Sequence, residues 1–75
     1  MHRMAAAVTF PRGAIVRFKD GRHAMYRVTY DFGLDGAGGE GYCEIEPFPN
    51  VFDDEPTAMP CEVLELVPDD LLAGA

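Results

Sequence analysis

Residues 14–32, AIVRFKDGRHAMYRVTYDF, decide the fold that this sequence predicts. The segment 14–19 is rich in β-branched and aromatic side chains, which is typical of a strand. Asp20-Gly21 follows, and both residue types tolerate the positive φ that a tight hairpin turn requires. The segment 23–32 then returns as a second strand. The stretch therefore predicts a β-hairpin.

Side chains alternate between two faces along 23–32. One face carries Tyr26, Val28, Tyr30 and Phe32. The other face carries Met25, Arg27, Thr29 and Asp31. A period of two is typical of a half-buried strand, so we expect the second set, Asp31 included, to face solvent.

Two more strands are expected downstream of this hairpin. The first is 42–46, which Pro47 should end because proline cannot donate to a sheet ladder. The second is 61–67, where a shift in the apolar pattern at Val63-Leu64 suggests a bulge.

The segments between and after the strands are expected to be connections. Residues 33–41 and 47–60 read as two long loops, and 68–72 predicts a single helical turn. The chain of 75 residues is too short for two domains. We therefore expect an all-β fold, a small barrel of about four or five antiparallel strands with a short C-terminal helical turn.

The domain boundaries follow from these elements. Residues 10–70 are expected to form the single barrel domain, 1–9 a flexible N-terminal arm, and 71–75 a C-terminal tail.

This order of parts resembles the small Src-homology-3-like (SH3-like) β-barrels of bacteria over about residues 11–70. The likeness rests on the GAIVR strand, the Asp-Gly turn, the GYCEIE strand and the CEVLELVP segment. Such barrels include KOW-type translation modules and type II dihydrofolate reductases. Those reductases bind folate with a Val-Gln-Ile-Tyr stretch, whereas 62–65 reads Glu-Val-Leu-Glu in a chain without Gln. The resemblance implies a fold and not an activity.

Charge is divided unevenly along the chain. All six basic residues lie within the first 27 positions, where Asp20 is the only acid. Residues 31–75 hold twelve acids and no base. Two interpretations are open: the bases form cross-strand ion pairs with the acids, or an unpaired acidic surface binds a basic partner.

Several function classes fit this composition poorly. A net charge of −7 without a basic stripe disfavours direct nucleic-acid binding, and KOW-type modules usually present a basic surface to RNA. The N-terminal apolar run is too short for a signal peptide or a membrane span, so we expect no membrane partner and a cytoplasmic protein. The composition, rich in Ala, Gly and Arg, hints at a bacterial or phage genome.

The sequence offers little for catalysis, a metal or a cofactor. The chain has no Ser, and Cys43 and Cys61 are expected to be reduced, half-buried thiols without a nearby His23. Their spacing does not match a zinc site. The glycine-rich loop 33–41 lacks the Gly-Lys-Ser/Thr ending of a phosphate-binding loop, so no cofactor is expected.

The sequence favours a binding role, and ten residues are candidates for a partner surface. They are aromatic and acidic residues that we expect to surround the groove between the two long loops. They are Tyr30, Phe32, Tyr42, Glu44, Glu46, Phe48, Phe52, Asp53, Asp54 and Glu55.

Three hypotheses follow, one of which is a purely structural subunit of a larger assembly. The first is a non-enzymatic protein-binding module, such as an inhibitor, an adaptor or a nucleic-acid mimic, that contacts a basic protein surface. It fails if Arg17, Arg22 and Arg27 pair the acids and leave no negative patch. The alternative is a homo-oligomeric small-molecule binder or minimal enzyme with its site between copies of the chain.

Overall fold

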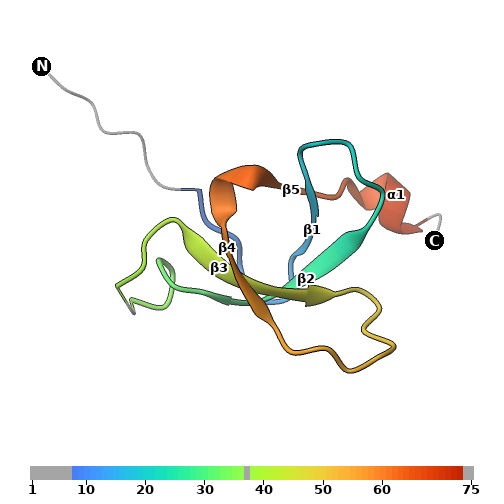
Figure 1. Cartoon of the computed structure of the whole chain (residues 1–75). Coiled ribbons are helices and arrows are strands. Elements are labelled where there is room, and N and C mark those ends of the chain that lie inside the picture. Colours follow the sequence, from blue (N-terminus) through green and yellow to red (C-terminus); the bar gives the residue numbers. More distant parts are fainter. Residues whose placement is uncertain (1–7, 37, 74–75) are drawn as a thin grey trace, which may run out of the picture.

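Five antiparallel strands form one sheet in the order β4-β3-β2-β1-β5 (Figure 1). The computed structural model describes residues 8–36 and 38–73. The strands are β1 (Ile15–Phe18), β2 (Met25–Asp31), β3 (Tyr42–Pro47), β4 (Thr57–Pro60) and β5 (Leu64–Leu66). A 3₁₀ turn η1 (Cys61–Val63) joins β4 to β5, and the short helix α1 (Asp69–Ala73) follows. The expected all-β class, with five antiparallel strands and a C-terminal helical turn, is confirmed.

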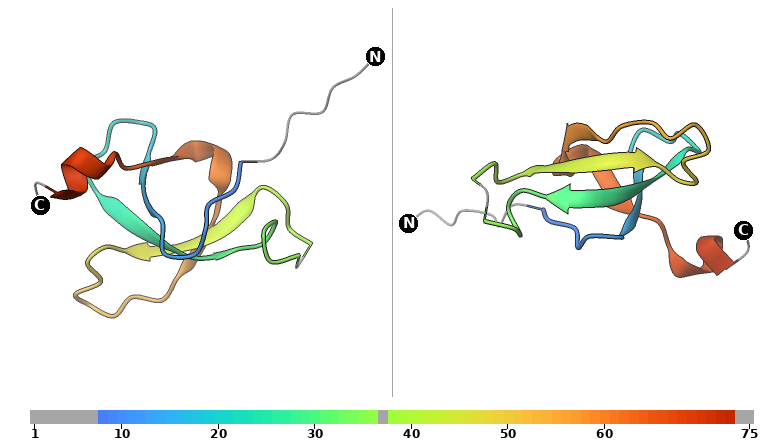
Figure 2. Two further views of the ribbon diagram at one scale, coloured as in Figure 1. Left: turned by 180° about the vertical axis from the view of Figure 1, so that it is seen from behind. Right: turned by 90° about the horizontal axis from the view of Figure 1, so that it is seen from below.

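The sheet curls around one small core. Figure 2 shows from two sides that β5 and β1 cross over β3 and β4 rather than continuing flat. The core of this barrel-like fold is made of side chains from β1, β2, β3, η1 and β5, together with Phe10. The buried cluster consists of Phe10, Val16, Val28, Cys43, Ile45, Cys61 and Leu64.

The first hairpin forms where the sequence predicts it, but residues 19–24 connect its strands, so the connection is longer than the tight turn that we expected. Val16 lies opposite Tyr26, and Phe18 contacts the Tyr26 ring edge-on with centroids 5.4 Å apart. Gly21 adopts a φ of 94° in the connecting turn, a conformation that favours glycine. This hairpin places Lys19–His23 at one end of the barrel.

A β-bulge in β2 overturns the predicted alternation. The register of β2 against β3 shifts between Val28 and Tyr30, so that Thr29 has no partner. After the shift Tyr30 faces outward, opposite Glu44, and Asp31 faces inward, opposite Cys43. The expectation that Asp31 faces solvent is wrong, because one extra residue exchanges the two faces of a strand.

The predicted fourth strand at 61–67 is also wrong in part. Its first three residues form η1, and only Leu64–Leu66 pair with β1. A separate strand, β4, arises inside the predicted loop 47–60 and pairs with β3. This strand lies at the sheet edge, where Pro60 is tolerated.

We expected β3 to end at Glu46, before Pro47. The strand instead includes Pro47 as its last residue. It lies opposite Tyr26 of β2. The missing N–H of Pro47 removes no ladder bond with β4, because β4 pairs only with residues 42–45 of β3.

The described residues include only parts of the expected arm and tail. Residues 1–7 of the predicted arm lie outside them, and Phe10, where the predicted domain begins, is buried. Leu71 and Leu72 belong to α1, where a helical turn is predicted over 68–72. Within residues 8–36 and 38–73 no helix is long and apolar enough to cross a membrane.

Candidate functional site

The ten predicted partner-binding residues fall into two groups at opposite ends of the barrel. One group lies on the outer face of β2 and β3 near the loop 33–41. The other group lies in the β3–β4 loop, and Figure 2 shows these two loops projecting in opposite directions. The described residues of the two long loops therefore do not flank the common groove that we expected.

The first group is an aromatic patch on the outside of the sheet. The Tyr30 and Phe32 rings meet edge-on with centroids 4.9 Å apart. The Arg12 guanidinium lies 5.8 Å from the centroid of the Tyr30 ring. Tyr42 is exposed, and Glu44 lies opposite Tyr30. Glu46, farther along β3, forms an ion pair with Arg27.

The second group forms what we call the acidic loop, residues 48–56. Phe52 and Val51 leave 84% and 72% of their surface exposed, which is unusual for apolar side chains in a folded chain. Asp53, Asp54 and Glu55 follow directly and are exposed as well.

A side-chain clamp holds the acidic loop in shape. The Asn50 side-chain amide donates to the Asp54 carbonyl at 2.9 Å, and its oxygen accepts from the Asp54 N–H at 2.8 Å. Asp53 adopts a φ of 55°, a left-handed conformation that Asp tolerates better than most residues. The tip of the loop is thus ordered before any partner arrives.

A groove opens beside the acidic loop, between it and the turn that joins β1 to β2. Its walls include Arg22 from the turn and Asp54 and Glu55 from the loop, and it encloses about 380 Å³. We call it the mouth groove. Its floor is apolar and consists of Phe18, Tyr26, Ile45, Pro47 and Met59.

Arg22 covers part of that floor. Its guanidinium lies 4.5 Å above the centroid of the Phe18 ring, and its Nε donates to the Asp20 carboxylate at 2.7 Å. A second hollow of about 580 Å³ continues along the same Phe18, Arg22 and Met59 side chains toward Glu62. The two hollows together make an elongated depression.

The ion pairs leave a negative excess at the surface. Arg12, Arg17, Arg22 and Arg27 pair with Asp35, Glu65, Asp20 and Glu46. Of thirteen acids, these four are paired and Asp31 is buried, which leaves eight. Those eight make no ion pair with another described residue, and they are Glu40, Glu44, Asp53, Asp54, Glu55, Glu62, Asp69 and Asp70.

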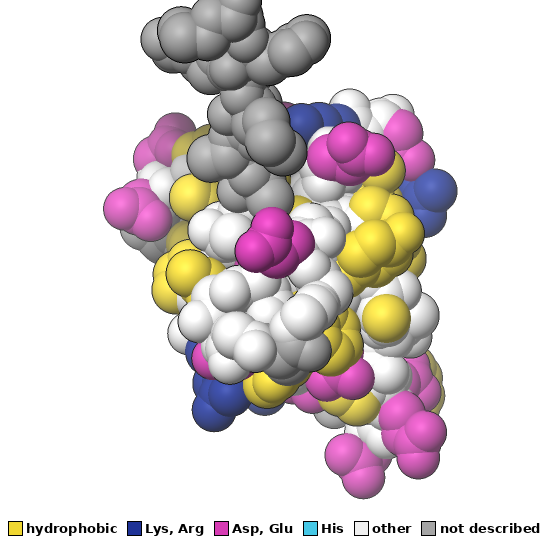
Figure 3. Space-filling view, turned by 90° about the vertical axis from the view of Figure 1, so that its left-hand side faces the viewer, with side chains coloured by type: hydrophobic (Ala, Val, Ile, Leu, Met, Phe, Trp, Pro, Cys, Tyr) yellow, Lys and Arg dark blue, Asp and Glu magenta, His cyan; other side chains and the backbone are white. Residues whose placement is uncertain are grey.

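The acids are spread over several faces, but the longest run is at the acidic loop. Figure 3, which views the molecule from the left of Figure 1, shows separate acidic side chains scattered over that face, with hydrophobic side chains between them and basic side chains only near its edges. Asp53, Asp54 and Glu55 are consecutive, and the last two line a groove with an apolar floor. The acidic loop and the mouth groove therefore form the main candidate site.

The buried side of the molecule holds a polar centre that the sequence did not reveal. Asp31 is 2% exposed and accepts hydrogen bonds from the backbone N–H groups of Phe10 and Leu34, at 2.8 and 3.0 Å. The Cys61 thiol lies 3.6 Å from the same carboxylate. These three donors satisfy the charge inside the core.

Both cysteines are free, as expected, but fully buried rather than half-buried. Burial is the main cause that raises the pKa of Cys61 to about 12, with the Cys43 thiol and the Asp31 carboxylate acting in the same direction. Burial also raises the pKa of Cys43. The sulfurs therefore stay protonated at neutral pH, and thiols are poor nucleophiles.

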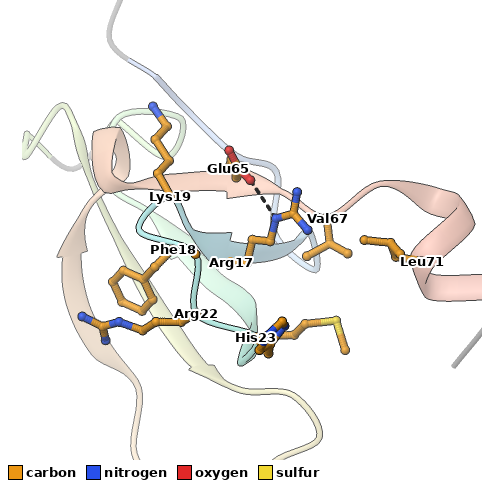
Figure 4. A pocket seen from close by; sticks show the side chains of 10 residues that line it. Arg17, Phe18, Lys19, Arg22, His23, Glu65, Val67 and Leu71 are labelled. Atoms are coloured by element: carbon orange, nitrogen blue, oxygen red, sulfur yellow. Dashed lines mark hydrogen bonds and ion pairs between the residues drawn. The ribbon is translucent and has the colours of Figure 1, made fainter.

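A second cleft lies between the outer face of β1 and β5 and the helix α1, and Figure 4 shows its side chains. Arg17, Met25 and Glu65 form one row across β5, β1 and β2, because Arg17 is the register partner of both others. Val67 and Leu71 line the α1 side of the cleft. The cleft encloses about 360 Å³, and we call it the Arg17 cleft.

Sequence reasoning missed Phe18, Arg22 and Met59 of the mouth groove, and Arg17 and His23 of the Arg17 cleft. The spacing of Asp20 and Arg22 across Gly21 signals a local ion pair, but not that Arg22 stacks on Phe18. Within residues 8–36 and 38–73, no group of three His, Cys, Asp or Glu side chains is placed to hold a metal.

Comparison with protein-family models, with curated proteins and with solved structures found no match to this chain.

Proposed function

We propose that this protein is a non-enzymatic protein-binding module that takes a basic, partly apolar segment of a partner protein at the acidic loop and the mouth groove. The observation that carries the proposal is the acidic loop, where exposed Val51 and Phe52 precede three consecutive carboxylates. Two of these, Asp54 and Glu55, line the aromatic-floored groove.

Charge favours a basic partner. The two hollows of the depression are lined by Asp20, Asp54, Glu55 and Glu62 against Lys19 and Arg22, so acids exceed bases. Asp53 adds a further negative charge beside them. Lys or Arg side chains of a partner would find carboxylates on the loop side, and such complementarity raises the association rate and the specificity.

The apolar part of the site favours an extended segment with at least one large apolar side chain. Phe18, Tyr26 and Met59 are only partly buried and form a floor into which such a side chain would fit. Phe52 on the acidic loop offers a further exposed aromatic side chain to such a segment. Aromatic anchors surrounded by polar rims commonly supply most of the binding free energy at protein interfaces.

The order of the site also supports binding. The Asn50 clamp fixes the loop, so that a partner would lose less conformational entropy on docking than with a disordered loop. The buried, protonated thiols of Cys43 and Cys61 support the non-enzymatic part of the proposal, since they are the strongest potential nucleophiles in the sequence.

The test is a peptide-display selection on the immobilised full chain. Peptides enriched by the wild-type protein should combine Arg or Lys with a large apolar residue. The same peptides should lose at least about tenfold in affinity for Phe52→Ala and for the triple variant Asp53→Asn, Asp54→Asn, Glu55→Gln.

The matched control removes the same charge elsewhere, with Glu40→Gln, Asp69→Asn and Asp70→Asn. It should keep the wild-type affinity within about twofold. Absence of enriched peptides, or equal binding by all variants, would contradict the proposal.

A homo-oligomer is the second candidate, and edge strand β5 favours it. This strand ends the sheet, and Leu66 on it is 56% exposed. Unpaired sheet edges with apolar side chains pair readily with another copy. Light scattering at low and high salt tests this: a dimer that persists in high salt supports an apolar interface through β5, and a monomer at both contradicts it.

A further inference from the structure

We propose that the Arg17 cleft is a second, independent binding site that takes a singly charged carboxylate attached to a short hydrocarbon body. It lies on the other side of the β1–β2 turn from the mouth groove and does not depend on the function proposed for that groove.

The guanidinium of Arg17 supplies the anion-binding group. Its Nε donates to a Glu65 carboxylate oxygen at 2.7 Å, and the pair is about one-third exposed. The terminal amino groups of Arg17 make no hydrogen bond with another described residue. A guanidinium presents paired donors in a plane, which suits the two oxygens of a carboxylate.

Glu65 does two things at this site. It fixes the orientation of Arg17, since the two residues are register partners on neighbouring strands. It also offsets the charge of Arg17, so the cleft as a whole has only a small positive excess. That excess comes from Lys19 at the rim, which has no ion-pair partner among the described residues.

The small excess favours a monoanion over a phosphate. A doubly charged phosphate placed on Arg17 would be repelled by the Glu65 carboxylate and by the net charge of −7. Arg22 is neutralised by Asp20, and Figure 4 shows Arg22 and Lys19 pointing away from the centre of the cleft. Arg17 is therefore the main positive charge that a ligand in the cleft would contact.

The other walls are built for a hydrocarbon. Val67 is buried at the base, while Met25 is partly exposed and Leu71 of α1 is 51% exposed. Figure 4 shows Val67 and Leu71 in a row beside Arg17, with His23 on the other side of the open space. A volume of about 360 Å³ is at the lower end of known small-molecule sites.

The test is an NMR titration of the uniformly ¹⁵N-labelled full chain with two carboxylates, N-acetylleucine and hexanoate. We expect saturable shifts at the amides of Met25, Glu65, Val67 and Leu71. N-acetylleucinamide, which has the same body without the charge, should bind at least about tenfold more weakly. Tighter binding of N-acetylleucine assigns the carboxylate to a chain end, and tighter binding of hexanoate assigns it to a free acid.

The variants use a matched ion pair. Arg27 and Glu46 form the same kind of cross-strand pair elsewhere on the sheet. Arg17→Gln should weaken carboxylate binding at least about tenfold, whereas Arg27→Gln should leave it unchanged. Glu65→Gln should tighten binding roughly threefold, because it removes the competing charge, while Glu46→Gln should not.

The gain with Glu65→Gln keeps the test decisive, since a misfolded variant would not bind more tightly. Binding of the amide as strong as that of the acid, equal effects of the Arg17 and Arg27 substitutions, or no saturable shifts would overturn the proposal. None of these results would bear on the mouth groove.

Discussion

The Asp31 carboxylate accepts a 2.8 Å hydrogen bond from the backbone N–H of Phe10, twenty-one residues earlier in the chain. The same side chain accepts from the Leu34 N–H on its other oxygen, at 3.0 Å. Through these two hydrogen bonds, the Asp31 carboxylate connects the segment before β1 and the start of the 33–41 loop to the end of β2 that follows the bulge. It is a charge held inside a core that is otherwise apolar.

We expect Asp31→Asn to lower the free energy of unfolding by about 2 to 4 kcal/mol. The amide group has the size of the carboxylate, but its NH₂ would face one of the two backbone N–H donors and leave that donor unsatisfied. Urea unfolding followed by fluorescence measures the change. Asp35→Asn, which removes an exposed ion pair with Arg12, should cost less than about 0.5 kcal/mol, and equal losses in the two variants would refute this role for Asp31.

Stability should fall at alkaline pH because of Cys61. In the unfolded chain a thiol loses its proton near pH 8.5, whereas burial raises the pKa of folded Cys61 to about 12. Its contribution is fully present below about pH 8.5 and is lost as the pH rises toward 12, at up to about 1.4 kcal/mol per pH unit. Cys61→Ser should show a shallower decline between pH 8.5 and 10 in urea unfolding, and an unchanged slope would contradict the account.

The pKa of Asp20 lies below its ordinary value, and the backbone N–H of Arg22 is the main cause. The guanidinium of Arg22 adds a second hydrogen bond and a favourable charge. Arg22→Ala keeps the backbone donor, so the pKa of Asp20 should return only part of the way. A carbonyl-detected NMR titration measures it, with Arg12→Ala as the unaffected control; a complete return would show that the side chain dominates.

The Asn50 clamp should control the order of the acidic loop. Asn50→Ala removes both side-chain bonds to Asp54, so the Asp54 amide should exchange its hydrogen at least about tenfold faster. Global stability should change by less than about 1 kcal/mol, because the loop is exposed. Exchange that matches the wild type would mean that the loop is held by other contacts.

The sequence was sufficient where the decisive interactions are local. The hairpin around Asp20-Gly21 forms where the sequence predicts it, since the strand pattern on either side of the turn, as far as Val28, depends on neighbouring residues. The helical turn after Pro68 is local for the same reason. The all-β class follows from such segments taken together.

The sequence was insufficient where backbone pairing or three-dimensional proximity decides. Nothing in Thr57–Pro60 is strongly typical of a strand, and β4 exists because the β3 backbone offers it an edge to pair with. The bulge at Thr29 is equally invisible in the side-chain pattern. It was the bulge that exchanged Tyr30 and Asp31 between the two faces.

The candidate site was only half predictable. Its acidic loop stands out in the sequence as Phe52 followed by three acids, and those residues are exposed together. The opposite wall is contributed by Arg22, which the sheet order brings near Asp54 across the barrel mouth. The aromatics Tyr30, Phe32 and Tyr42 were assigned to the same groove but lie at the other end.

The central claim, that the acidic loop and the mouth groove bind a basic partner segment, is tested most directly by mapping one display-selected peptide on the ¹⁵N-labelled chain. The account predicts amide shifts concentrated at residues 18–22 and 48–59, lost in Phe52→Ala. Shifts confined to β5 or to the aromatic patch around Tyr30, with the acidic loop unaffected, would contradict it.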